Sequence, residues 1–178
     1  MLDSDVVLSL DALTAAPLVA AAPAYAQRLV EALRRATPAL LALDDAATAR
    51  RPAPGRWSPR EIVGHLVDSA SNNHQRFVRM RDRDDLVVDG YEQDRWVASQ
   101  RYTEAPWMEL VLLWMTYNRH LARVMAATPA TDRDRARTVH NLHLRAFRPV
   151  PPDRDVTLAY FMNDYVEHLE HHLAQILG

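Results

Sequence analysis

The sequence predicts an all-α fold, a four-helix bundle with a long crossover before the last helix. Glycine occurs at only 4 of 178 positions, whereas Ala, Leu and Arg, which favour helices, are abundant. Apolar residues recur at helical spacing over long segments, and no repeat of solenoid length is present. Four such segments with one long connection are typical of a bundle rather than of a simple stack of helical hairpins.

The first helix is predicted from Pro23 to Leu43, because leucines recur along one side of it, and Pro38 is expected to bend it. Residues 1–22 are expected to form an N-terminal extension, and residues 23–178 the bundle domain. Residues 44–57 contain prolines and a glycine and are predicted to be a connector.

The second helix has the clearest start in the sequence. Ser58, Pro59 and Glu61 combine an N-cap, a proline at the first helical position and the residue that completes a capping box. The helix is predicted to run to about Arg81, and the acidic stretch 82–94 is predicted to be a loop.

The last two helices flank a long connection. The third is predicted to begin at Thr103 or Pro106 and to end at Ala127. Residues 128–156 contain four prolines, which preclude a continuous helix there. The fourth helix is predicted to begin at Thr157, a suitable N-cap, and to run to the C-terminus.

The composition excludes several classes of protein. A net charge of −2 gives no electrostatic reason to expect nucleic-acid binding. All 21 basic residues are Arg, which excludes a Lys nucleophile. The absence of Cys excludes a disulfide scaffold, a thiolate zinc site and a Cys nucleophile. The few glycines cannot build a Rossmann fingerprint or a P-loop. The eight His are therefore the main candidates for a functional site.

The location is predicted to be cytoplasmic. Residues 14–26 have the small and apolar residues of a signal peptide, but the acidic residues before them contradict the positively charged leader that secretion needs. No run of about 18 apolar residues is present that could span a membrane.

A polar stripe is predicted on the second helix. His65, Ser69, Asn72 and Arg76 fall within an arc of about 60°, beside the apolar face. His65 is therefore expected at the edge of the core. Alone, such a His is more often a hydrogen-bonded core residue than a metal ligand.

The last helix changes this interpretation, because it carries three His within five positions. His168 and His172 lie about 40° apart, which is close enough for both imidazoles to bind one metal ion. The apolar residues place His172 within the buried arc, His168 at its edge and His171 toward solvent. With His65 they would form a site of three neutral imidazoles with an open position for water, suited to Zn²⁺ or Ni²⁺.

Other side chains are weaker candidates. Four carboxylates are expected to be mainly solvated helix charges, with orientation of a bound imidazole as the alternative: Asp68, Asp164, Glu167 and Glu170. Trp57 and Tyr165 are predicted to be core aromatics and His74 a surface residue, whereas His120 is not assigned. The long crossover is predicted to be a solvated loop, with a lid that binds substrate carboxylates as the alternative; its basic residues are Arg133, Arg135, Arg137, His140, His143, Arg145 and Arg148.

Two motifs carry a family resemblance. Gly55-Arg56-Trp57-Ser58-Pro59-Arg60-Glu61-Ile62-Val63-Gly64-His65-Leu66-Val67-Asp68-Ser69, followed by Asn73 and Arg76-Phe77, resembles the second-helix signature of the DinB-like superfamily, and above all its YfiT-like branch. His168-Leu169-Glu170-His171-His172-Leu173-Ala174-Gln175-Ile176 is similar to the last-helix motif of that family. The resemblance covers about residues 23–178. It implies a four-helix bundle, frequently a homodimer, in which His65, His168 and His172 bind a divalent metal ion.

The resemblance also implies a metal-dependent enzyme, with a thiol S-transferase ahead of a hydrolase. In the transferase, the metal would activate a low-molecular-weight thiol such as bacillithiol for attack on a small electrophile; in the hydrolase it would activate water. Mycothiol-dependent isomerases of the superfamily have Glu where this chain has His168, and an additional C-terminal domain, so their activity is not expected. The alternatives are a noncatalytic stress-associated or ligand-binding bundle with a structural metal, and a helical dimer whose His line a polar seam.

Overall fold

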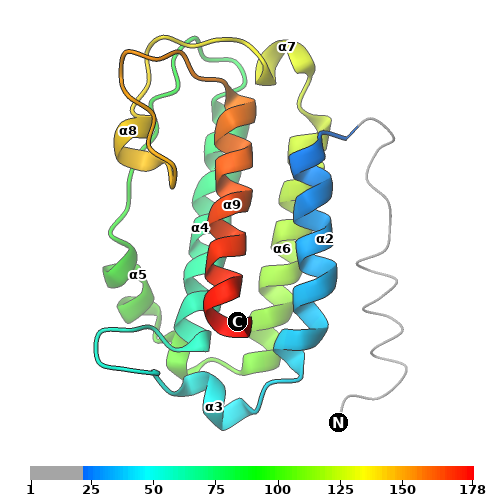
Figure 1. The fold of residues 1–178 in the computed structure, drawn as a ribbon, viewed down its shortest axis with the longest axis vertical. Helices are drawn as coiled ribbons and strands as arrows, with labels where there is room; N and C mark the ends of the chain where they lie inside the picture. The colour runs from blue at the N-terminus through cyan, green and yellow to red at the C-terminus, as the bar shows by residue number, and fades with distance from the viewer. Residues whose placement is uncertain (1–21) are drawn as a thin grey trace.

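The computed structural model describes residues 22–178, which form a bundle of helices, and the all-α prediction is confirmed (Figure 1). The long helices are α2 (Ala24–Leu41), α4 (Pro59–Arg79), α6 (Trp107–Ala127) and α9 (Leu158–Leu177). The connections contain α3 (Asp45–Ala49), α5 (Gln93–Gln100), the 3-10 helix η1 (Tyr102–Glu104), α7 (Ala130–Arg133) and α8 (Leu142–Arg145). Apart from Ala22, the predicted extension 1–22 lies outside the described residues. None of the described helices is long and apolar enough to cross a membrane.

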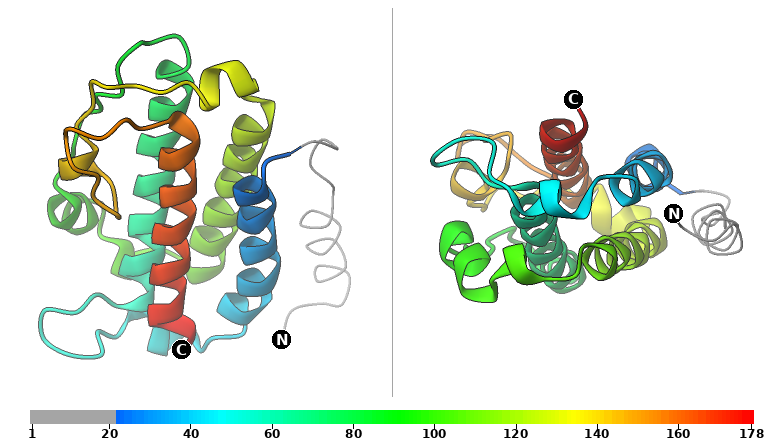
Figure 2. Two further views of the ribbon diagram at one scale, coloured as in Figure 1. Left: turned by 45° about the horizontal axis from the view of Figure 1, so that its top comes forward. Right: turned by 90° about the horizontal axis from the view of Figure 1, so that it is seen from below.

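Each long helix packs against two others. α2 packs on α6 and α9, and α4 packs on the same two helices. α4 and α6 run in one direction, whereas α2 and α9 run in the other (Figures 1 and 2). Nε1 of Trp107 donates a hydrogen bond to the carbonyl of Leu40, so the start of α6 lies beside the end of α2. Arg60 donates to the carbonyl of Ala105, which places the starts of α4 and α6 together.

Two long connections join the last three long helices. Residues 80–106 return along the bundle, because the neighbouring helices α4 and α6 are parallel (Figure 1). Residues 128–157, which include the predicted connection 128–156, cross one end of the bundle. A bridge between Leu86 and His140 joins the two connections to each other.

The long helices end within two residues of their predicted limits. α2 ends at Leu41 rather than Leu43 and continues through Pro38. The short helices α3 and α5 begin inside segments 44–57 and 82–94, which were predicted to be irregular. Neither is long enough to show the apolar period from which a helix is predicted.

The predicted start of α4 is confirmed. Oγ of Ser58 accepts a hydrogen bond from the N–H of Glu61, and the Glu61 carboxylate accepts one from the N–H of Ser58. Further along this helix, the ring of Tyr102 lies against Gly64, and a Cβ at that position would overlap the ring. The glycine therefore lets the connection 80–106 approach α4 one residue before His65.

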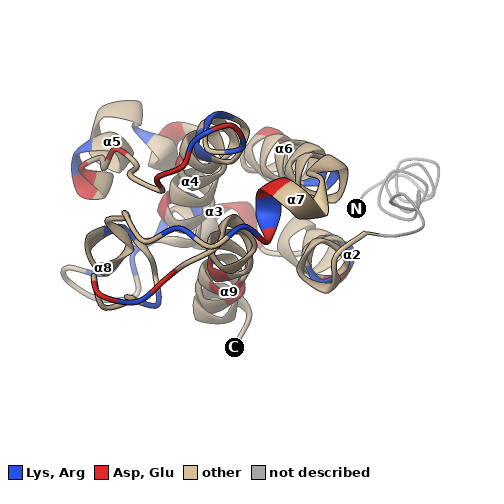
Figure 3. Cartoon of the chain, turned by 90° about the horizontal axis from the view of Figure 1, so that it is seen from above, with Lys and Arg blue, Asp and Glu red and all other residues tan. Residues whose placement is uncertain are grey.

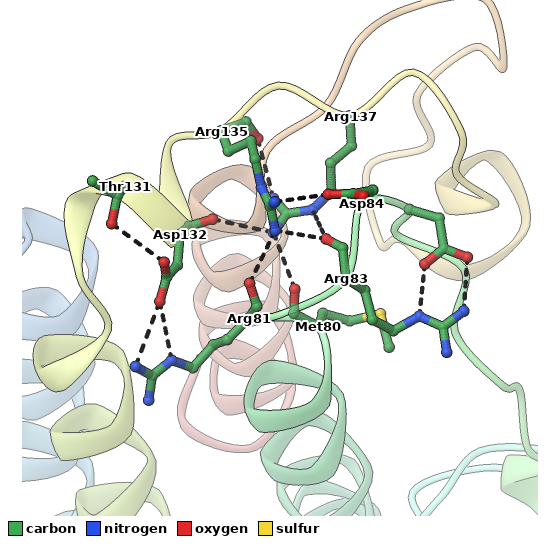
Figure 4. Close-up of polar contacts among 9 residues, drawn as sticks. Met80, Arg81, Arg83, Asp84, Thr131, Asp132, Arg135 and Arg137 are labelled. Atoms are coloured by element: carbon green, nitrogen blue, oxygen red, sulfur yellow. Dashed lines mark hydrogen bonds and ion pairs between the residues drawn. The ribbon is translucent and has the colours of Figure 1, made fainter.

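Arg137 anchors the second connection to the end of α4. Its buried guanidinium donates hydrogen bonds to the backbone carbonyls of Met80, Arg83, Asp132 and Arg135 (Figure 4). Figure 3 shows the basic residues of this connection spread over that end of the bundle. The expectation of a solvated loop is therefore wrong for Arg137, because its guanidinium satisfies carbonyls that would otherwise lack partners. It is correct for His143, Arg145 and Arg148, which are exposed.

Candidate metal centre

Three His side chains meet between α4 and α9. α4 provides His65, and α9 provides His168 and His172, which are one turn apart. Nitrogen atoms of the three rings all lie within 4.8 Å of one another. Nε2 of His65 is 3.2 Å from Nε2 of His168. The structure thus brings together the three residues that the sequence selects, and their role as metal ligands stays a prediction.

The burial of two of the three His differs from the expectation. His65 is only 1% exposed, so it lies within the core rather than at its edge. The Trp57 ring, whose centroid is 4.9 Å from that of His65, packs beside it. His168 is half-buried, as expected at the edge of the buried arc, and His171 is exposed, as predicted. His172 is also half-buried and so is less buried than its predicted place within that arc.

Burial keeps these imidazoles neutral. Burial and the nearby His172 lower the pKa of His65 to about 3. Burial, followed by the charges of the neighbouring His, lowers the pKa of His168 well below its usual value, and burial also lowers that of His172. At neutral pH each ring therefore has one unprotonated nitrogen, which is the form that binds a divalent metal ion.

The separation of two of these nitrogens fits such an ion. Two nitrogens bound to tetrahedral Zn²⁺ are roughly 3.3 Å apart, and the Nε2 atoms of His65 and His168 are separated by 3.2 Å. Nδ1 of His172 is 2.9 Å from Oε1 of Gln175. Because this oxygen can only accept, Nδ1 carries the proton and Nε2 of His172 remains free to bind an ion.

A pocket of about 460 Å³ opens onto the three His. Its walls come from α4, α9 and both long connections. The polar stripe predicted on α4 is partly correct, because Ser69 and Arg76 line this pocket. Asn72 does not; its amide donates to the carbonyl of Asp68, and the neighbouring Asn73 faces the pocket instead.

Two carboxylates expected to be mainly solvated are buried. Asp164 accepts hydrogen bonds from the backbone N–H groups of Phe147 and Arg148, and holds the second connection against α9. Asp68 accepts one from the hydroxyl of Tyr102. Burial raises the pKa of both carboxyls. The other two carboxylates form ion pairs at the surface, Glu167 with Arg148 and Glu170 with Arg28.

The predicted core aromatics differ in their roles. Tyr165 is buried, and its hydroxyl donates a hydrogen bond to Oδ1 of Asn118. Trp57 is only half-buried, and beside its contact with His65 it lines a second pocket of about 260 Å³. That pocket also reaches His172, so two pockets meet at the cluster.

His74, His120, His140 and His143 lie outside this pocket, whereas His171 lines it. His140 is buried, and both ring nitrogens form hydrogen bonds within the second connection, whereas His143 is exposed. His74 was predicted at the surface but is half-buried; it contacts the hydroxyl of Tyr117 and the ring of His120.

Sequence reasoning missed the residues that the connections bring to the pocket. Tyr91 and Phe147 line it, and neither stands in a periodic segment that would predict its direction. Arg145 was one of several basic residues considered for a lid, and it is the member of that set that lines the pocket.

Comparisons agree with this architecture. YfiT from Bacillus subtilis, described as a probable metal-dependent hydrolase with an unusual four-helix bundle topology, shares the fold with a TM-score of 0.69. The two chains are 20% identical, and the match covers 85% of this chain and 81% of that one. No curated protein matches this chain. The family model of the DinB superfamily matches residues 28–176, and the protein therefore belongs to that superfamily.

Proposed function

We propose that this protein is a metal-dependent enzyme that acts on a small molecule in the pocket beside His65, His168 and His172. The observation that carries the proposal is the convergence of three neutral imidazoles on an open pocket. Three protein ligands leave room for a water or a substrate atom, whereas structural zinc sites are usually closed by four. The description of YfiT as a probable metal-dependent hydrolase supports the proposal.

The residues of the site have separate tasks. A divalent ion, Zn²⁺ or Ni²⁺, bound there would act as a Lewis acid toward a thiol or a water molecule. The three imidazoles would hold the ion, and Gln175 keeps the proton of His172 on Nδ1. Burial raises the pKa of Tyr91 to about 12, so its phenol stays protonated and can donate a hydrogen bond to a polar group in the pocket.

We place a small-molecule thiol S-transferase ahead of a hydrolase. Pockets of about 460 and 260 Å³ both reach His172, which gives a thiol and an electrophile separate places to bind. The chain has no Cys, so the sulfur would come from a low-molecular-weight, bacillithiol-like thiol. The hydrolase is the second candidate, and the description of YfiT favours it.

Metal content tests the first step. The full chain, purified without a His-tag, should contain about one divalent ion per chain by mass spectrometry, because its three neutral imidazoles converge. His168→Ala should lose the ion, and His171→Ala, an exposed neighbour, should keep it. A wild-type protein that binds neither added Zn²⁺ nor added Ni²⁺ would contradict the proposal.

Turnover distinguishes the candidate functions. A transferase should consume an electrophile such as monochlorobimane only when both a thiol and the metal are present, and His168→Ala should abolish this reaction. Metal-dependent hydrolysis without thiol would favour the hydrolase. Metal-dependent stability with neither reaction would favour the alternative of a noncatalytic bundle with a structural metal.

A further inference from the structure

Two arginines line the pocket away from the three His. Arg76 comes from α4 and Arg145 from the end of α8 in the second connection. Arg76 lies three turns beyond His65, about 16 Å along the helix axis. Because helical side chains lean toward the N-terminus, the Arg76 side chain extends back toward the His. One pocket therefore has imidazoles at one end and guanidinium groups at the other.

Both guanidinium groups are held at the same backbone segment. Arg76 donates hydrogen bonds to the carbonyl of Asp89 and, at 3.4 Å, to Oδ1 of Asn73. Arg145 lies against Gly90, where a Cβ would overlap its guanidinium. Burial lowers the pKa of Arg76, and the positive charge of Arg145 lowers it further, whereas Tyr91 and Asp89 raise it. The two positive charges therefore lie near each other.

No carboxylate of residues 22–178 forms an ion pair with either arginine. Asp164 also lines the pocket, but its two oxygens accept backbone hydrogen bonds of 2.9 and 2.6 Å from Phe147 and Arg148. Arg76 is half-buried and Arg145 is exposed, and their like charges repel each other. The Asp89 charge offsets part of this repulsion at Arg76, and a bound anion would relieve more of it.

We propose that Arg76 and Arg145 form a subsite for an anionic group, a carboxylate or a phosphate, on a substrate whose reacting atom lies at the three His. This inference rests on the proposed function for the position of the reacting atom. Planar guanidinium groups match the paired oxygens of carboxylates and phosphates. The substrate class is thus a small organic anion, whose charged group lies on the order of 10 Å from its reacting atom.

The test measures anion binding to the metal-free full chain by calorimetry, with succinate and inorganic phosphate as probes. Arg145→Gln should weaken binding at least tenfold, because it removes charge-assisted hydrogen bonds. Arg148→Gln is the matched control, since Arg148 is exposed in the same connection, lies outside the pocket and pairs with Glu167. Gly90→Ala should also weaken binding, without any change of charge, because the methyl group displaces the Arg145 guanidinium. Unfolding midpoints check that each variant folds.

The outcomes separate this subsite from the metal centre. His168→Ala should bind the anions as tightly as the wild-type protein. Anion binding therefore tests the subsite independently of metal binding. Stronger binding of succinate would identify a carboxylate ligand, and stronger binding of phosphate a phosphate ligand. Equal weakening by Arg145→Gln and Arg148→Gln would overturn the proposal, as would the absence of saturable binding of either anion.

Discussion

The imidazole of His172 has two nitrogens, and one hydrogen bond decides which of them carries the proton. Nδ1 donates to Gln175 on the next turn of α9. Gln175→Ala should therefore lower the affinity for the metal about tenfold, because the ring loses its fixed orientation and tautomer. Competition with a chromophoric chelator measures this affinity. Gln75→Ala, an exposed residue of α4, should leave it unchanged; a similar loss in both variants would contradict the role of Gln175.

Burial of His65 makes the stability of the metal-free protein depend on pH. The unfolded chain binds a proton at this residue near pH 6.5, whereas the folded protein binds one only at about pH 3. Lowering the pH through this interval therefore favours the unfolded state, and the free energy of unfolding should fall by roughly 2–3 kcal/mol between pH 6.5 and 4.5.

Urea unfolding of the metal-free protein at several pH values measures this effect. Comparison with variants removes the contribution of other titrating groups, because that contribution is the same in each protein. His65→Gln should lose this part of the pH dependence, and His143→Gln, an exposed control, should keep it. An unchanged slope in His65→Gln would show that other groups cause the dependence.

At the scale of elements, Arg137 links a long connection to the helix that it passes. Its side chain is 1% exposed and donates to four backbone carbonyls. Arg137→Met should lower the free energy of unfolding by about 2–4 kcal/mol, because it leaves buried carbonyls without donors. Urea unfolding measures this loss, and limited proteolysis should become faster within residues 128–156. Arg154→Gln, exposed in the same connection, should change neither result.

For the whole molecule, a bound ion should stabilise the fold, because the three His proposed to bind it come from two helices that meet only in the folded chain. The His65 and His168 rings are 103 positions apart in sequence. Metal at a hundred times its dissociation constant should add about 2.7 kcal/mol, which corresponds to a rise of roughly 5–10 °C in Tm. A thermal scan with and without chelator measures this rise. The same rise in His168→Ala would place the metal elsewhere.

The sequence predicted those features that depend on a single helix, such as its limits and the direction of its side chains. Helical period and the capping box at Ser58 predicted the long helices, and the phase of α9 separated the inward His172 from the exposed His171. Residues whose surroundings depend on the irregular connections were not predictable. Asp164 is buried because backbone N–H groups of residues 147–148 reach it, and no local pattern encodes that path. The expected homodimer stays a prediction.

The parallel course of α4 and α6 has an electrostatic consequence. Peptide dipoles give a helix a partial negative charge at its C-terminus, and these two neighbours place both such ends on one side of the bundle. The second connection brings positive charge there: Arg133 donates to the carbonyl of Thr128 at the end of α6, and Arg137 to that of Met80 at the end of α4. Its arginines thus add to the positive N-terminal ends of α2 and α9, which run in the opposite direction, in balancing the C-termini of α4 and α6.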